Sequence, residues 1–503
     1  MVDTKKEQER DELHRAIWAI ADELRGAVDG WDFKNYVLGT MFYRYISENL
    51  CNYINSGEID AGNTDFDFTK MPDEDAEEAR EGLVEEKGFF ILPSELFCNV
   101  RANAANDENL NETLERVFRH IEESAKGSEA ESDFAGLFDD YDVNSNKLGS
   151  TVAKRNEKLV KLLNGVGEMN LGDVKDHSID AFGDAYEYLM TMYASNAGKS
   201  GGEFFTPADV SELLTRLGTV GKTEINKVYD PACGSGSLLL KAEKILGKDA
   251  IRNGFYGQEI NITTYNLCRI NMFLHDVGFD KFDIACEDTL LSPQHWDDEP
   301  FELIVSNPPY SIKWAGDENP LLINDPRFAP AGVLAPKSKA DMAFIMHSLS
   351  WLASNGTAAI VCFPGIMYRG GAEQKIRKYL VDNNYVDCII QLPSNLFFGT
   401  SIATCIMVMK KVTNNNKLTP ENIDRIVDVF AKREEVKHFS HLASYEEVAG
   451  NDYNLSVSTY VEAEDTREKI DIVKLNAEIK EIVVREQVLR DEIDKIIAEI
   501  EMG

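Results

Sequence analysis

The feature that most constrains this chain is a series of short strand-like runs that begins near residue 200. Seven runs rich in β-branched and aromatic residues alternate there with stretches of helical periodicity. Most intervals leave room for a crossover helix, and such crossovers join parallel strands. We therefore expect an α/β domain built on a mainly parallel sheet. The runs lie at 227–229, 255–257, 282–285, 303–305, 358–363, 386–392 and 403–409.

The last two runs are joined by only a short segment, 393–402, which leaves no room for a crossover helix. We expect these two strands to form an antiparallel pair at the edge of the sheet.

The part of the chain before these runs has a different hydrophobic pattern, because its apolar residues recur at helical spacing. Two stretches, 57–87 and 126–146, are acidic and loop-like, and no strand alternation is found. This predicts a helical N-terminal domain over about 1–170, followed by the α/β domain at 171–415. The apolar stripes of the first two expected helices are Leu13, Ile17, Ile20 and Leu24, and Val37, Met41, Tyr45 and Ile46.

Beyond residue 411 the chain is polar and then helical again. At 475–500, apolar residues follow alternating spacings of four and three, a pattern typical of a coiled-coil seam. Such a seam needs a covering helix, which either its own protein or a partner can supply. We expect a C-terminal helical region over 416–503, with 475–500 as a candidate partner-docking helix.

The charge balance argues against a nucleic-acid partner, because 52 Lys and Arg residues against 87 Asp and Glu residues give a formal net charge of −35. Such a surface repels phosphate backbones. The eight cysteines are scattered without a Cys-x-x-Cys pair, which indicates reduced thiols. No apolar run reaches membrane-spanning length and no signal sequence is found, so we expect a cytoplasmic protein with no membrane contact.

The first candidate site is Asp-Pro-Ala-Cys-Gly-Ser-Gly-Ser at 230–237, between a strand-like run and an apolar helical run. Gly234 and Gly236 allow positive φ and let a ligand approach the backbone. The start of the following helix offers free N–H groups to an anionic group. A dinucleotide fingerprint would need a third glycine where Leu239 stands, so NAD is disfavoured. A structural turn is the competing interpretation of a lone Gly-x-Gly.

The second candidate is Glu259, which ends the next strand-like run beyond the glycine loop. An acidic residue at this place suits the ribose hydroxyls of a nucleoside cofactor. Taken alone it is more often a helix cap, but beside a glycine loop the ribose role is favoured.

The third candidate is Ser-Asn-Pro-Pro-Tyr at 306–310, directly after the run at 303–305. Its two prolines fix φ and remove two N–H donors, so the loop is stiff and its carbonyls face outward. Asn307 adds a side-chain acceptor beside the Pro308 carbonyl. Two acceptors next to the Tyr310 ring can hold a planar exocyclic amino group and stack its ring.

Together, 230–237, Glu259 and 307–310 resemble the S-adenosylmethionine-dependent amino-methyltransferases. The order of motifs is informative, because Glu-Phe-Phe-Thr-Pro at 203–207 precedes the glycine loop and Asn-Pro-Pro-Tyr follows it. This order resembles the γ arrangement of the DNA N6-adenine methyltransferases.

Three further segments, 182–189, 198–207 and 451–456, are similar to the modification subunit (HsdM) of type I restriction–modification systems. The resemblance covers nearly the whole chain and departs from the family at Cys233, where alanine is commoner. It implies a Rossmann-like methyltransferase sheet with a helical N-terminal domain before it and helices after it.

The resemblance implies transfer of a methyl group from S-adenosyl-L-methionine to N6 of an adenine flipped out of double-stranded DNA. Asn307 and Pro308 would hold N6, and Tyr310 would stack on the base. No metal is implied. The catalytic residues would be Asn307, Pro308, Pro309 and Tyr310. The cofactor residues would be Glu203, Phe204, Phe205, Thr206, Pro207, Ala208, Asp230, Gly234, Ser235, Gly236, Ser237, Glu259 and Asp288.

The resemblance also implies partners: a specificity (S) subunit that reads the DNA sequence, a second copy of the modification subunit, and a restriction (R) subunit. An acidic catalytic subunit is then compatible with DNA, because its partner holds most of the duplex. Lys313, Lys337 and Lys339 are either local phosphate contacts or part of a solvated loop. Two alternatives are a protein N5-glutamine methyltransferase, for which the chain is long and the motif order unusual, and a catalytically silent scaffold subunit, against which the intact motifs argue.

Overall fold

The computed structural model of the chain describes residues 4–24, 30–171, 181–196, 206–316, 319–397, 402–411, 425, 427–429, 431–451, 453 and 457–462. The chain divides into two compact units, Met1–Thr413 and Asn414–Gly503. Among the described residues, no helix combines the length and the apolar character that crossing a membrane requires.

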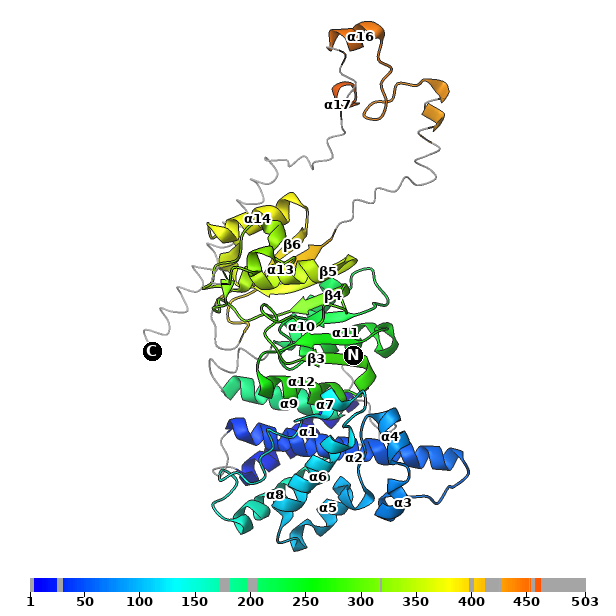
Figure 1. The fold of residues 1–503 in the computed structure, drawn as a ribbon, viewed down its shortest axis with the longest axis vertical. Coiled ribbons are helices and arrows are strands. Elements are labelled where there is room, and N and C mark those ends of the chain that lie inside the picture. The colour runs from blue at the N-terminus through cyan, green and yellow to red at the C-terminus, as the bar shows by residue number, and fades with distance from the viewer. Residues whose placement is uncertain are drawn as a thin grey trace, which may run out of the picture. The chain divides into compact units, whose positions relative to one another are not determined.

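The first unit begins with a layer of helices, as expected. The predicted stripe at Leu13, Ile17 and Ile20 is buried, as are Val37 and Met41. Figure 1 shows the first eight of these helices, coloured blue to cyan, gathered beside α9 and α12. The eight are α1 (Thr4–Leu24), α2 (Gly30–Asp60), α3 (Asp73–Glu77), α4 (Arg80–Lys87), α5 (Phe97–Asn103), α6 (Leu110–Ser124), α7 (Glu131–Phe134) and α8 (Val152–Glu168), and α9 (Ala181–Asn196) follows them.

The acidic stretches at 57–87 and 126–146 are less loop-like than expected, because they contain α3, α4 and α7. Leu83 and Phe134 are buried in the core, and these apolar anchors hold short helices whose exposed faces are acidic. The expectation of loops was based on charge and was wrong at these three helices.

The second part of the first unit is a seven-stranded sheet with the order β3-β2-β1-β4-β5-β7-β6. The first five strands in this order are parallel, and β7 is antiparallel to both of its neighbours. The predicted mainly parallel sheet is confirmed, and so is the antiparallel pair, with β6 at the edge and β7 inserted beside β5. The strands are β1 (Val228–Asp230), β2 (Phe255–Gln258), β3 (Phe282–Ala285), β4 (Phe301–Ser306), β5 (Leu352–Cys362), β6 (Val386–Gln391) and β7 (Cys405–Lys410).

Helices cover both faces of the sheet. Alternate strand residues point to opposite faces, so Val228 joins the core shared with the N-terminal helices while Tyr229 joins a second core. The first core also contains apolar residues of α10 (Ala208–Gly218), α11 (Ser237–Leu246) and α12 (Ile262–Leu274). The second contains residues of α13 (Asp341–Trp351) and α14 (Ala372–Asp382).

Single-turn 3₁₀ helices occur in the connections of the first unit. They are η1 (Phe68–Lys70), η2 (Pro93–Glu95), η3 (Ala104–Asn106), η5 (Lys248–Ala250), η6 (Phe279–Lys281), η8 (Leu322–Asn324), η9 (Ala329–Ala331) and η10 (Pro364–Met367).

The second unit contains the short helices α16 (Tyr445–Gly450) and α17 (Val457–Tyr460). His441 forms ion pairs with Glu435 and Glu447 in this unit, both at 2.9 Å. The predicted coiled-coil seam at 475–500 lies outside the described residues.

Candidate functional site

The candidate motifs meet at one edge of the sheet because they follow adjacent parallel strands. The glycine loop follows β1, Glu259 follows β2, and the Asn-Pro-Pro-Tyr loop follows β4, and these three strands are neighbours in the sheet. The carboxyl ends of parallel strands form the usual ligand crevice of such folds.

The glycine loop requires glycine at two places. Gly234 has φ +54° and Gly236 has φ +77°, in the left-handed region that side chains rarely adopt. A Cβ atom on Gly236 would also lie 2.8 Å from the Sγ of Cys268 and 2.9 Å from the Cε of Met272, both on α12. The tight turn therefore brings the start of α11, at Ser237, directly to the sheet edge.

The carboxylate of Glu259 is tied to the glycine loop. Its Oε2 accepts a hydrogen bond from Gly234 N–H at 3.1 Å, and its Oε1 accepts one from Asn261 N–H at 2.9 Å. Each oxygen keeps a second lone pair. The cap of α12 is Asn261, whose side chain accepts from Thr264 N–H, so Glu259 is not used as the helix cap. Burial raises the pKa of the Glu259 carboxyl.

Asp230 lies fully buried at the end of β1. Its Oδ1 accepts a hydrogen bond from Ala232 N–H at 3.0 Å, while Oδ2 has no partner at ordinary hydrogen-bond geometry among the described residues. Burial raises the pKa of this carboxyl to about 7, and the nearby hydroxyl of Ser306 acts in the opposite direction. An under-satisfied acceptor beside the glycine loop suits a ligand that brings its own donor, such as an ammonium group.

The amide of Asn307 is held from both ends. Its Nδ2 donates to the Oγ1 of Thr206 at 3.1 Å, and its Oδ1 accepts from the hydroxyl of Tyr310 at 2.6 Å. Pro308 is buried and stiffens the loop between them. The segment before α10 and the loop after β4 are thus joined through one side chain.

The ring of Tyr310 is half-buried and packs edge-to-face against Phe397, with the ring centroids 6.3 Å apart and the planes at 85°. Burial raises the pKa of the Tyr310 hydroxyl, which therefore stays a neutral donor. Phe397 is itself buried.

The remaining predicted site residues lie in the turn after β3, in the glycine loop and at the start of α10. The carboxylate of Asp288 accepts hydrogen bonds from the N–H groups of Leu290 and Leu291 and so shapes the turn after β3. The hydroxyl of Thr289, in the same turn, donates to the carbonyl of Pro231 at 2.6 Å and so joins this turn to the glycine loop. The hydroxyls of Ser235 and Ser237 lie 2.9 Å apart. Pro207 and Ala208 begin α10. The predicted residues Glu203, Phe204 and Phe205 lie outside the described part of the chain.

Sequence reasoning missed the polar residues that support these loops from behind. The Nδ2 of Asn271 donates to the Ser235 carbonyl at 2.7 Å. The Nε2 of Gln258 donates to the carbonyls of Glu287 and Ser292 at 3.1 and 2.9 Å. The signal that could have found them is a polar residue within an otherwise apolar helix or strand, because a buried polar group must have partners.

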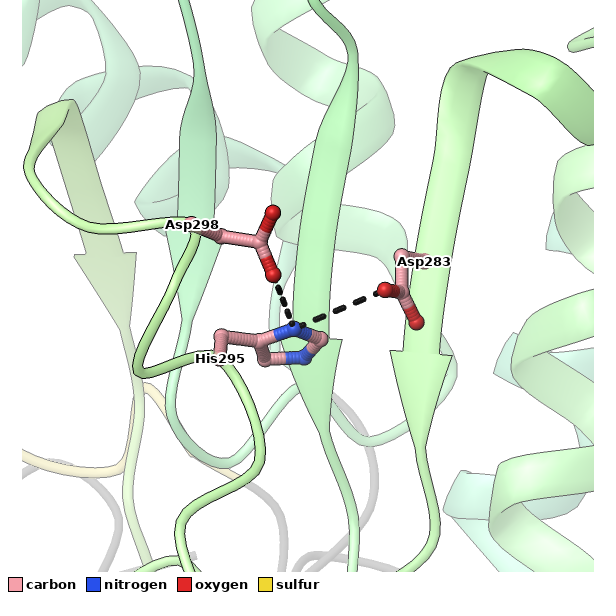
Figure 2. Close-up of side chains that lie close together, drawn as sticks. All are labelled: Asp283, His295 and Asp298. Carbon is pink, nitrogen blue, oxygen red and sulfur yellow. Dashed lines mark hydrogen bonds and ion pairs between the residues drawn. The ribbon is translucent and has the colours of Figure 1, made fainter.

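One cluster has the chemistry of a metal site, and Figure 2 shows it. The ligand atoms of Asp283, His295 and Asp298 all lie within 4.8 Å of one another. The imidazole Nε2 lies 2.9 Å from the Gly257 carbonyl, so it carries a proton, and Nδ1 lies 3.3 Å from Asp298 and 3.7 Å from Asp283.

A cation also lies beside this cluster, because Lys227 Nζ lies 3.8 Å from the Oδ1 of Asp298. The cluster thus links the loop that follows Asp288 to the strands β2 and β3.

The comparisons with known proteins identify the family of this chain. The family model of N-6 DNA methylases matches residues 177–415 and 409–469, and the model of the HsdM N-terminal domain matches residues 13–166. The type I restriction enzyme MpnII methylase subunit of Mycoplasma pneumoniae is 48% identical over 100% of this chain and 98% of its own length. The MjaVII methylase subunit of Methanocaldococcus jannaschii is 32% identical over 67% of this chain and 61% of its own.

A solved structure shares the architecture as well. The crystal structure of the type I restriction–modification methyltransferase subunit from Streptococcus thermophilus matches with a TM-score of 0.71 and 34% identity, over 90% of this chain and 100% of that one. These matches confirm the resemblance inferred from the motifs and decide against the glutamine-methyltransferase alternative. The chain belongs to the N-6 DNA methylase family, in which S-adenosylmethionine is the cofactor, and it is the methylase subunit of a type I restriction–modification system.

Proposed function

We propose that the loop after β4 performs the N6-adenine methylation of this family, with Asn307 as the residue that holds the target amine. The observation that carries the proposal is the position of the Asn307 amide, which is fixed by Thr206 and Tyr310 at the end of β4. Neighbouring strands bring Glu259 and the glycine loop to the same edge.

In this proposal, the Oδ1 of Asn307 and the carbonyl of Pro308 accept the two hydrogens of the N6 amino group. Holding both hydrogens in one direction leaves the nitrogen lone pair free to face the methyl donor. S-adenosylmethionine, when bound, supplies an electrophilic methyl group on a sulfonium. The contribution of the chain is therefore orientation and the exclusion of water.

The donor set of the glycine loop fits the cofactor. Glu259 has a spare lone pair on each carboxylate oxygen for the two ribose hydroxyls. The under-satisfied Oδ2 of Asp230 suits the ammonium of the methionine part. Asp288, on the turn after β3, is the candidate for the adenine amine. The matched segment also includes Glu203, Phe204 and Phe205, which we propose complete the pocket.

The target base must leave the duplex, because N6 is paired within the helix and cannot reach the methyl donor there. We propose that the Tyr310 ring stacks on the flipped adenine. Stacking on an aromatic ring is worth about 1–3 kcal/mol per base.

For its partners, we propose double-stranded DNA, a specificity subunit, a second methylase subunit and a restriction subunit, together in the cytoplasm. The support is the net charge of −35, which makes this chain a poor DNA binder by itself. We further propose that the seam at 475–500 docks on the specificity subunit. Co-purification with a chain truncated before Leu475 tests this, and normal assembly of the truncated chain would contradict it.

The central test is the variant Asn307→Ala in the assembled complex. Transfer should fall by about 10²–10³-fold, since a fixed polar contact to the reacting group is lost. Cofactor affinity measured by calorimetry should stay within about twofold, since Asn307 faces the target. Glu259→Ala should instead act on cofactor affinity, and should weaken cofactor binding by about 1–3 kcal/mol.

The exposed Asn253→Ala is the matched control and should behave as wild type. Appreciable transfer by Asn307→Ala would remove Asn307 from its role. A wild-type complex that binds the cofactor but does not methylate adenine would instead favour the silent-scaffold alternative.

A further inference from the structure

The loop that carries Tyr310 is anchored at its far end by a residue from another element. Asp341 is the first residue of α13 and is 6% exposed. Its Oδ1 and Oδ2 lie 3.2 and 3.1 Å from the backbone nitrogen of Ser311, so one N–H is shared between both carboxylate oxygens. Charge-assisted bonds of this kind are stronger than those between neutral groups.

Ser311 needs such an anchor, because its φ is +52°. This left-handed region is unfavourable for a residue with a side chain, since the Cβ atom crowds the following carbonyl oxygen. Ser311 directly follows Tyr310. The left-handed conformation of Ser311 therefore determines the direction of the chain immediately after the Tyr310 ring. Strain of this kind persists only where surrounding contacts hold it.

The turn is continued by a paired segment that leads back to α13. Ala340 N–H donates to the carbonyl of Ile312 at 2.9 Å, and Trp314 N–H donates to the carbonyl of Lys337 at 3.0 Å. The chain after Tyr310 therefore runs alongside the chain before Asp341. One end of the Asn-Pro-Pro-Tyr loop is held by β4, and the other is held by this carboxylate.

The surroundings of Asp341 act on its carboxyl in two directions. Burial raises the pKa of the carboxyl, while the Ser311 N–H bond and the nearby cations Arg369 and Lys339 act in the opposite direction. No metal or substrate role is needed to explain a buried acid at this position.

We propose that Asp341 is a positioning residue for methyl transfer, which holds Ser311 in its left-handed conformation and thereby fixes the Tyr310 ring against which the target adenine stacks. The inference rests on the proposed role of Tyr310. It goes beyond the Asn-Pro-Pro-Tyr motif, because Asp341 belongs to a separate element, the helix α13.

The test uses the assembled complex of the methylase with its specificity subunit, on duplex DNA with 2-aminopurine at the target adenine. Asp341→Ala should slow single-turnover methylation of normal DNA by about 10–100-fold, equal to about 1.4–2.7 kcal/mol. The 2-aminopurine fluorescence of the Asp341→Ala complex should differ from that of the wild-type complex, because the flipped base loses its fixed stacking partner. Cofactor affinity should remain within about twofold of wild type.

Two further variants separate positioning from general stability. Adding Ser311→Gly to Asp341→Ala should restore most of the rate, because glycine adopts the left-handed conformation without the side-chain strain. Ser311→Val should slow transfer while Asp341 is intact, since a β-branched residue cannot occupy this region easily. Asp341→Asn keeps one acceptor and should lose less than Asp341→Ala.

The exposed Asp249→Ala serves as the matched control in the same domain. The proposal is overturned if Asp341→Ala has a wild-type rate and fluorescence, or if Ser311→Gly gives no rescue. Should Asp341→Ala fail to assemble, a wild-type rate for Ser311→Val overturns it equally. A wild-type complex that flips 2-aminopurine but transfers no methyl group would count against the proposed function and not against Asp341.

Discussion

At the scale of single residues, the Asn307 acceptor is already occupied. The hydroxyl of Tyr310 donates to the Oδ1 of Asn307 at 2.6 Å, and in the proposed role of Asn307 the target amine uses the same oxygen. An entering adenine would then share this oxygen with the hydroxyl or displace it, while the Tyr310 ring would serve as the proposed stacking surface. The hydroxyl and the ring of Tyr310 would thus have opposite effects on target binding.

Tyr310→Phe should consequently keep methylation and lower the KM for DNA by up to about tenfold, since one hydrogen bond of about 1 kcal/mol no longer competes. Tyr310→Ala should lose about 1–3 kcal/mol of target stacking. Steady-state methylation at fixed salt measures both. If Tyr310→Phe were as impaired as Tyr310→Ala, the hydroxyl would be required for transfer and the displacement argument would be wrong.

At the scale of elements, the loop after β3 is held by the cluster of Asp283, His295 and Asp298 (Figure 2). Because Lys227 already faces Asp298 and the Gly257 carbonyl already engages the imidazole Nε2, we expect chelation to leave the melting temperature and activity unchanged. Asp298→Asn should lower the unfolding free energy by no more than about 1 kcal/mol, since the partly exposed side chain loses its charge towards Lys227 but keeps one acceptor oxygen.

The neighbouring exposed Asp297→Asn is the control for this experiment. Thermal melts with EDTA, and then with added Zn²⁺, measure the metal effect. A melting temperature that falls with EDTA and recovers with Zn²⁺ would identify the cluster as a metal centre.

The sequence predicted the mainly parallel sheet because strand-like runs alternate with helical stretches, and the strand order in the structure then explains why the motifs meet. Glu259 and Asn307 each follow a strand-like run, and parallel strands bring such positions to one edge. The anchor between Asp341 and Ser311 could not be predicted, because it joins residues from separate elements. The left-handed φ of Ser311 likewise depends on tertiary contacts and not on residue type.

The whole molecule is acidic, and some of its carboxyl groups are buried in ways that oppose ionisation. Burial raises the pKa values of Asp133 and Asp230 to about 7, and it also raises those of Glu259 and Asp341. A net charge of −35 adds self-repulsion to the folded state at neutral pH.

These pKa shifts determine how the stability of the isolated chain depends on pH. A carboxyl whose pKa is higher in the folded than in the unfolded state binds more protons when folded, so stability falls as pH rises between the two values. For Asp133 and Asp230 this window extends from about 4 to about 7. Surface carboxyls with lowered pKa values, such as Asp67, act in the opposite sense below pH 4.

The unfolding free energy of the isolated chain should therefore be highest near pH 4 and fall by a few kcal/mol towards pH 8, since one pKa unit corresponds to about 1.4 kcal/mol. Added salt should stabilise the chain more at pH 8 than at pH 5, because it screens the larger net charge. Asp230→Asn should flatten the profile, because it removes the buried carboxyl, whereas the exposed Asp249→Asn should leave it unchanged. Urea unfolding across this pH range measures each effect, and a maximum at pH 7–8 in the wild type would show that the buried carboxyls ionise without cost.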